Sequence, residues 1–243
     1  MKRFIFIALA LMLVLSSFVF VTPAAAAAKR PASVYVIHGI PGQDLGADPA
    51  LPVDILVNDT NCLLKGFTYK QIAGPVPLPE GTYNFKISLA NAAAPCTNAP
   101  VITADVPFVS GEVATVIAHL TEAGAPTASK FVNDTSILHA FLTRLTVRHT
   151  AAAPTVDIGI EIQWGDLTFA TKVPGLSNPN QAGPVKLPPF NYMVKLYPAN
   201  EPNPVFGPVD LKLRMGRAYF VYAVGSFSTG SFDLIVHTIG PRR

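Results

Sequence analysis

One segment of this 243-residue chain occurs twice, 109 positions apart. Residues 74–90 align without a gap on residues 183–199, and eight of the 17 positions are identical. Residues 36–38 match residues 147–149 upstream, so the order of the similar segments is kept. Similarity at a fixed spacing indicates a chain built from repeated structural units. The sequence therefore predicts a duplicated module, and this duplication limits the possible folds more than any other feature.

The length of the repeat predicts two domains. Each copy has about 100 residues, the size of one immunoglobulin-like sandwich. We expect a first module over residues 32–134, a linker over 135–143 and a second module over 144–240. The linker could also contain a short helical turn.

The side-chain pattern within each copy predicts β-strands. Apolar residues alternate with polar residues or glycine from Val156 to Trp164, and the same alternation occurs from Tyr83 to Leu89. A period of two is typical of half-buried strands in antiparallel sheets. We expect an all-β protein with two tandem antiparallel β-sandwiches, immunoglobulin-like or transthyretin-like, of about seven strands each. Trp164 and Phe169 are expected to pack in the second core.

The first 28 residues have the layout of a signal peptide. Lys2 and Arg3 precede a long apolar run, and the small residues 24–28 after Pro23 provide cleavage sites. The alternative is a membrane anchor, because the run approaches the length of a spanning helix. The alanine cluster favours cleavage. We expect a secreted protein, located outside the cell, on its surface or in the periplasm, with no membrane insertion after cleavage.

The charge balance of the mature chain argues against two classes of partner. Without residues 1–28 the chain has 16 basic and 15 acidic residues. Nucleic acids and anionic lipids are bound by clusters of positive charge, and no such cluster is present in the sequence. We therefore expect neither as a partner.

Two cysteines occur, Cys62 and Cys96, both in the first copy. An even pair in an exported protein predicts a disulfide, here between two loops. A redox pair or a metal site is the alternative. Their spacing is far from Cys-x-x-Cys, which favours the disulfide.

Two polar residue types recur at matching positions in the copies. His38 and His149 lie on the same strand faces as apolar neighbours, which predicts inward-pointing structural histidines. Asp54 and Asp157 are expected to organise the preceding loop by accepting backbone N–H bonds. A catalytic role for these four residues is the alternative.

The sequence contains no established catalytic motif. It has neither a Gly-x-Ser-x-Gly elbow nor a zinc-binding His-Glu-x-x-His, and no pair of carboxylates is singled out. Asp44 and Asp48 could contribute to a calcium site, but the loop lacks the glutamate of established patterns. We expect no catalytic residues, no metal site and no cofactor.

A ten-residue loop, residues 42–51, has no counterpart of equal length in the second copy. Loops at the ends of such scaffolds carry recognition. We therefore expect Gln43, Asp44, Leu45 and Asp48 to form a binding loop with the adjoining residues 92–100. The expected partner is a protein or a glycan at the cell surface.

The alternative function is a carbohydrate-binding accessory module or a hydrolase. Sugar rings stack on exposed aromatic side chains. The candidates for such a row are Tyr197, Phe206, Tyr219 and Phe227, provided that they are exposed.

Five segments together resemble a family of exported bacterial proteins, the family catalogued as domain of unknown function 4397. These segments are residues 36–41, 53–58, 74–83, 116–120 and, in the second copy, 149–158. The resemblance implies two tandem copies of a β-sandwich module in the cell envelope or outside the cell, and it implies no reaction and no ligand. Two departures from the family pattern concern turns: the long loop 42–51, and Pro189-Phe190 in place of an acidic or small residue followed by glycine.

Overall fold

The structure is a computed structural model that describes residues 29–138, 141–164 and 167–240. The predicted signal peptide, residues 1–28, lies outside the described residues. Within these ranges the regular secondary structure is β-strand apart from one short 3-10 helix, η1 (Gly42–Leu45). None of the described helical segments has the length and hydropathy needed to span a membrane.

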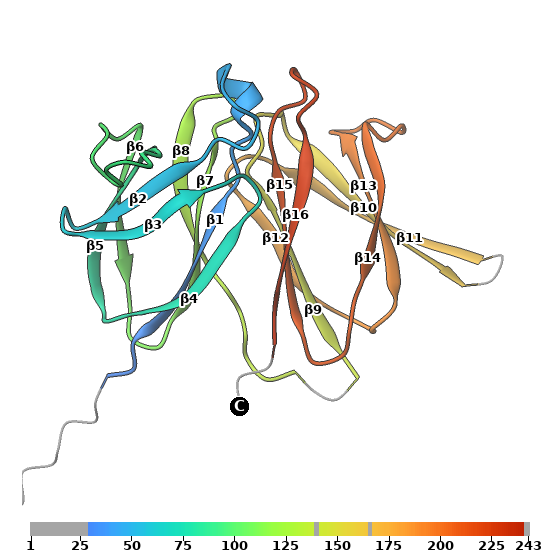
Figure 1. Ribbon diagram of the computed structural model, residues 1–243. Helices are drawn as coiled ribbons and strands as arrows, with labels where there is room; N and C mark the ends of the chain where they lie inside the picture. Colours follow the sequence, from blue (N-terminus) through green and yellow to red (C-terminus); the bar gives the residue numbers. More distant parts are fainter. Residues whose placement is uncertain (1–28, 139–140, 165–166, 241–243) are drawn as a thin grey trace, which may run out of the picture.

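The first sandwich unit consists of eight strands in two four-stranded sheets (Figure 1). One sheet has the order β4-β1-β7-β8 and the other the order β3-β2-β5-β6. The strands are β1 (Ala32–His38), β2 (Val53–Val57), β3 (Asn61–Phe67), β4 (Ile72–Leu78), β5 (Gly81–Leu89), β6 (Ile102–Phe108), β7 (Val113–Leu120) and β8 (Pro126–Val132).

The second sandwich unit repeats this arrangement strand for strand. Its sheets have the orders β12-β9-β15-β16 and β11-β10-β13-β14, so each strand occupies the place of the strand eight positions earlier. The strands are β9 (Thr143–His149), β10 (Val156–Trp164), β11 (Leu167–Leu176), β12 (Gln181–Leu187), β13 (Asn191–Pro198), β14 (Phe206–Lys212), β15 (Ala218–Val224) and β16 (Asp233–Ile239). The all-β sandwich architecture predicted from the sequence is confirmed.

One strand pair in each unit is parallel, whereas the sequence predicted antiparallel sheets. β1 pairs with β7 in parallel, and β9 pairs with β15 in the same way. The remaining pairs are antiparallel. Every residue of β7 and of β15 is buried. β15 is a continuous apolar run, and only Thr115 and His119 interrupt the apolar residues of β7. Such runs are typical of strands that are covered on both faces.

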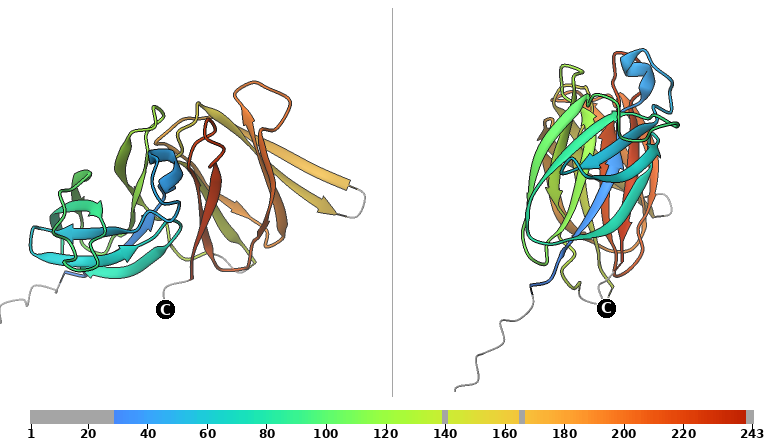
Figure 2. Two further views of the ribbon diagram at one scale, coloured as in Figure 1. Left: turned by 45° about the horizontal axis from the view of Figure 1, so that its top comes forward. Right: turned by 60° about the vertical axis from the view of Figure 1, so that its left-hand side comes forward.

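Strands β7 and β15 are covered on both faces because the two units pack against each other. Each unit has its own apolar core between its two sheets. A third apolar cluster joins the sheet of β1 and β7 to the sheet of β9 and β15. Its members include Ile37, Ile117, Phe131, Phe220 and Tyr222. The molecule therefore has four sheet layers, with the contact between the units, here called the seam, in the middle (Figure 2).

Arg148 of β9 lies in the seam and is fully buried. Its guanidinium carbon is 4.7 Å from the ring centres of both Phe131 and Phe220. Its nitrogens donate hydrogen bonds to Asn133, Tyr222, Gln181 and the Val132 carbonyl. These acceptors are neutral, so hydrogen bonds and aromatic faces stabilise the buried charge.

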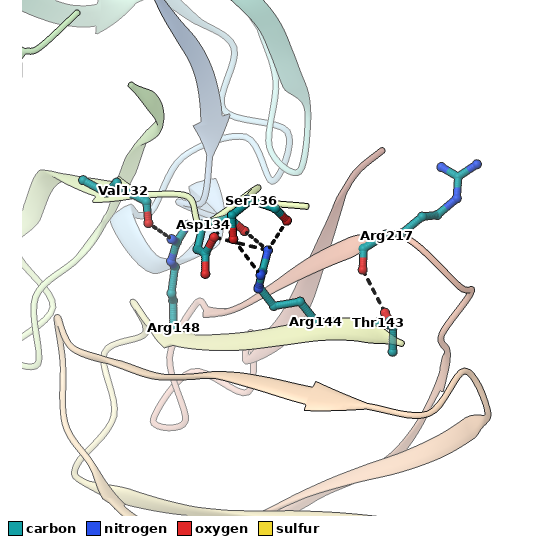
Figure 3. Close-up of polar contacts among 7 residues, drawn as sticks. All are labelled: Val132, Asp134, Ser136, Thr143, Arg144, Arg148 and Arg217. Atoms are coloured by element: carbon teal, nitrogen blue, oxygen red, sulfur yellow. Dashed lines mark hydrogen bonds and ion pairs between the residues drawn. The ribbon is translucent and has the colours of Figure 1, made fainter. Parts of the chain in front are cut away.

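Arg144, four residues before Arg148, holds the connection between the units (Figure 3). It donates to the carbonyls of Asp134 and Ser136, each at 3.0 Å, and to the Ser136 hydroxyl at 2.9 Å. Its guanidinium also lies 3.2 Å from the Asp134 carboxylate. Residues 134–138 have no regular secondary structure. Arg144 therefore attaches the connecting segment to β9, and Arg148 attaches the end of β8.

The prolines that lie within strands are concentrated in the edge strands. Six of the eight edge strands contain proline, whereas the central strands contain it only at the last residue of β13, Pro198. Proline has no N–H to donate, so it is tolerated at an edge and prevents another strand from completing a ladder there. The prolines of these six strands thus protect one or both edges of each sheet.

Two expectations about packing need correction. Phe169 does not pack in the second core, because its side chain is 57 % exposed on the edge strand β11. Cys62 lies in strand β3 rather than in a turn. The side chain of Trp164 lies outside the described part of the structure.

Candidate functional site

The loops after β1 and β5 lie at one end of the first unit. The loop after β1 begins with η1 and returns to β2 at Val53. The loop after β5 is fixed by a disulfide between Cys62 and Cys96, whose Cα atoms are 5.9 Å apart. The predicted disulfide is therefore present. A link across 34 residues stabilises the fold by roughly 3 to 4 kcal/mol in the chain-entropy model.

Asp54 organises the same loop through its carboxylate. One oxygen accepts the N–H of Gly66 at 2.9 Å, and the other accepts those of Asn91 at 3.1 Å and Cys96 at 2.9 Å. Burial alone raises the pKa of Asp54, but these three donors and nearby Lys65 outweigh it and lower the pKa. The aspartate does accept backbone bonds as predicted. Its donors, however, come from β3 and from the loop after β5, not from the preceding loop.

Asp157 has the same role in the second unit. Its carboxylate accepts the N–H of Gly175 at 2.9 Å and that of Asn200 at 3.2 Å. These two bonds lower its pKa. Gly66 and Gly175 both have positive φ, 57° and 70°, at a bulge of an edge strand. The bulge leaves an N–H without a ladder partner, and the aspartate satisfies it.

His38 and His149 are also matched hydrogen-bonding groups. Nε2 of His38 donates to the Leu51 carbonyl at 2.9 Å, and Nδ1 accepts the N–H of Ile40. His149 makes the equivalent bonds to the Pro154 carbonyl and the Ala151 N–H. Burial lowers the pKa of both histidines, more than the carbonyl bonds raise it. Both rings are neutral and fully engaged, so each fixes the loop that follows its strand.

A small apolar cavity of about 40 Å³ lies beneath the two loops of the first unit. Leu45 of the loop after β1, Leu89 at the end of β5 and Val101 of the loop after β5 line it. Their side chains are 38 %, 49 % and 58 % exposed. We call these three residues the apolar rim. Exposed apolar side chains gathered in one place make this surface the candidate contact site.

The four residues of the predicted binding loop have different environments. Gln43 and Leu45 are exposed. Asp48 is exposed, and its carboxylate accepts the N–H of Ala50 at 2.8 Å. Asp44 is half-buried and accepts hydrogen bonds from the hydroxyls of Thr229 and Ser231 in the second unit. The loop therefore also joins the two units, a role that no sequence signal indicated.

The aromatic residues considered for sugar stacking do not form an exposed row. Tyr197 and Tyr219 are buried, at 7 % and 5 % exposure. Phe206 and Phe227 are partly buried, and both contact Phe232, with ring centres 4.8 and 4.2 Å apart. These side chains belong to the packing of the second unit.

Two further histidines are buried in the seam and were not singled out from the sequence. Burial lowers the pKa of both His119 and His237 to about 4. His119 donates from Nδ1 to the Leu120 carbonyl and contacts the Ser129 hydroxyl through Nε2. Both side chains are buried away from solvent. No group of three or more potential metal ligands occurs among the described residues.

The comparison with solved structures found several distant similarities. The TIE protein of Bacillus anthracis matches with 12 % identity over 81 % of this chain and 33 % of its own, with a TM-score of 0.25. A Bacteroides ovatus protein, provisionally described as a cell adhesion protein, matches with 10 % identity over 89 % and 99 %, with a TM-score of 0.28. A streptococcal ancillary pilin matches with 12 % identity over 78 % and 60 %, with a TM-score of 0.20.

This chain thus spans about a third of the length of the Bacillus anthracis protein. The search of curated proteins found no match. A family model, described as domain of unknown function DUF4397, matches residues 32–159. The match covers the whole first unit and continues through β9 into β10. Because it spans more than half of the chain, the protein belongs to the DUF4397 family.

Proposed function

We propose that the protein is a secreted, non-catalytic binding module of the bacterial cell envelope that contacts a protein partner through the apolar rim. The predicted signal peptide and the disulfide support secretion, because disulfides persist in oxidising compartments. The observation that carries the proposal is the exposure of Leu45, Leu89 and Val101 around one apolar cavity.

The chemistry of this surface favours a protein over a glycan. The cavity of about 40 Å³ has room for the end of one aliphatic side chain. Protein interfaces gain most of their affinity from such anchors, which fill a pocket and exclude water. A sugar would need convergent polar groups and an exposed aromatic platform. The aromatic candidates named above are packed in the second unit instead.

The same surface supports a binding role rather than a catalytic one. His38, which lines the cavity, has both ring nitrogens engaged by the backbone. Asp54 accepts three backbone N–H bonds, which leaves little capacity for proton transfer. A hydrolase would need an acid or base that can reach a substrate.

The test is binding of the purified protein to the surface of the bacterium that produces it. We expect Leu45→Ser combined with Val101→Ser to weaken binding at least about tenfold, because both anchors are lost. Val205→Ser is the matched control, since Val205 is 51 % exposed in the second unit. Protease treatment of the cells should abolish binding. Unchanged binding by the double variant, or binding that survives protease treatment, would contradict the proposal.

We also propose that the second unit is a second copy of the family module. The bonds of Asp54 and His38 recur at Asp157 and His149, as described above. Tyr83 and Tyr192 likewise donate to the carbonyls of Pro79 and Pro188, each at 3.0 Å. Equal distances between equivalent atoms support a common origin. We further propose that the modules extend over residues 32–134 and 144–240, with residues 135–143 as the connection.

A further inference from the structure

A second, larger cleft lies where the two units meet. It has a volume of about 370 Å³, within the usual range for small-molecule sites. Three connections line it: residues 122–124 between β7 and β8, residues 152–154 between β9 and β10, and residues 226–228 between β15 and β16. One wall therefore comes from the first unit and two from the second.

The walls are held by hydrogen bonds within and between the units. The Asn178 side chain donates to the Leu120 carbonyl at 2.8 Å and to the Ala151 carbonyl at 2.6 Å, which ties the first wall to the second. Ala152 donates to the Gly225 carbonyl at 2.7 Å, which ties the second wall to the third. The cleft is therefore formed before any ligand arrives, and a ligand does not have to order it.

The third wall, residues 226–228, is held by hydrogen bonds and a ring contact within the connection between β15 and β16. Ser226 accepts the N–H of Ser228 through its hydroxyl and donates its own N–H to the Ser231 hydroxyl at 2.8 Å. Ser231 in turn contacts Asp44. The Phe227 ring stacks on Phe232 with an angle of 22° between the rings. The aromatic side chain of this wall is therefore held in one orientation.

The lining contains one ionisable side chain, Glu122, and it is acidic. Glu122 is exposed and lies on the turn between β7 and β8, on the wall that the first unit contributes. His149 donates to the carbonyl of Pro154, another lining residue. No lysine or arginine is among the lining residues that the structure describes.

We propose that this cleft binds a small organic cation, a primary ammonium group carried on a short hydrocarbon chain. Glu122 would pair with the ammonium group, and the Ser228 hydroxyl would accept one of its hydrogens. The face of Phe227 and the side chains of Ala153 and Pro154 would contact the hydrocarbon. This inference concerns a different site from the apolar rim and does not depend on the proposed partner.

The test is a backbone NMR titration of the purified protein with n-butylammonium chloride. We expect saturable shifts at the amides of residues 123, 124, 153 and 228, with weaker binding at higher salt. Glu122→Gln should weaken binding about fivefold, the upper end of what an exposed ion pair contributes. Glu201→Gln is the matched control, because Glu201 is exposed on the loop between β13 and β14. An unchanged melting temperature shows that each variant is folded.

Three results would overturn the proposal. The first is the absence of saturable shifts with n-butylammonium. The second is equal affinity of the Glu122→Gln variant and the unaltered protein. The third is binding of 1-butanol or of glucose to the same amides with equal affinity, since both lack the positive charge.

Discussion

At the scale of single residues, buried polar groups repeat in both units and serve the same purpose. Asp54 and Asp157 accept the N–H groups of bulges and loops. His38 and His149 each bind an N–H near the start and a carbonyl near the end of the loop that follows. Each repeated pair satisfies backbone groups that no strand ladder can reach. The recurrence of these residues in the sequence therefore has a structural reason in both units.

We predict that Asp54→Asn lowers the free energy of unfolding by about 1 to 3 kcal/mol, because an amide group replaces an oxygen that accepts buried N–H bonds. Asp157→Asn should lower it as well, through the equivalent donors. Urea denaturation at pH 7 measures both. Asp210→Asn is the control, since Asp210 is exposed and should change stability by less than about 0.5 kcal/mol. Equal stability of Asp54→Asn and Asp210→Asn would contradict this role.

The buried histidines predict a loss of stability in mild acid. His119 and His237 have a pKa of about 4 in the fold, below the value of about 6.5 in an unfolded chain. The unfolded chain therefore binds more protons below pH 6.5, so the free energy of unfolding falls as the pH drops from about 6.5 towards 4.

Each of these two histidines should lower the free energy of unfolding by about 2 kcal/mol between pH 7.5 and pH 5. Urea denaturation at the two pH values measures this loss. Because His119→Gln removes one titrating group, the difference between the two free energies of unfolding should be about 2 kcal/mol smaller in this variant. An unchanged difference in this variant would show that His119 takes up its proton equally in both states.

At the scale of elements, prolines in the edge strands should prevent edge-to-edge pairing between the sheets of different molecules. Pro77 lies in edge strand β4 and Pro107 in edge strand β6, one in each sheet of the first unit. Replacing both with valine restores two N–H donors and raises β-propensity. We predict faster aggregation of this variant at 37 °C, measured by light scattering. Pro202→Val, in the loop between β13 and β14, is the control. Equal scattering of both variants would contradict a protective role.

Most strands could be predicted from the alternation of side chains, but the central strands of the seam could not be interpreted correctly. In β9, Arg144, Thr146 and Arg148 alternate with apolar residues and suggest a solvent-facing side. All three are buried, because the seam covers that side of the sheet. The alternation of side chains shows which face of a strand is polar. It does not show whether another unit covers that face. The continuous apolar run of β15 was the signal that a second covered face existed.

The candidate site was predicted only in part for a similar reason. The loop after β1, with Leu45 in it, was identified by its length, and the disulfide was recognised from the pair of cysteines. The role of Asp44 was missed, because its partners Thr229 and Ser231 are about 185 residues away and belong to the other unit. The cleft was missed as well, since three separate connections form it and none has a motif.

At the scale of the whole molecule, two similar sandwiches form one body. The seam contains an apolar cluster, the buried Arg148 and polar contacts at its margins, including the ion pair of Lys70 with Asp233. Both the apolar rim and the cleft depend on this packing. Asp44 fixes the rim loop against the second unit, and the cleft has walls from both units. Separation of the units would remove the wall of the cleft that the first unit contributes.

The most direct test of this account is to cut the connection and ask whether the units stay together. A protease site inserted between Ile137 and Phe141, which are 91 % and 74 % exposed, allows cleavage of the folded protein. Size-exclusion chromatography of the cleaved protein should give one peak at the mass of the uncut chain, and two fragments should separate only in denaturant. Two folded fragments that elute separately under native conditions would contradict the claim that the units pack stably against each other through the seam.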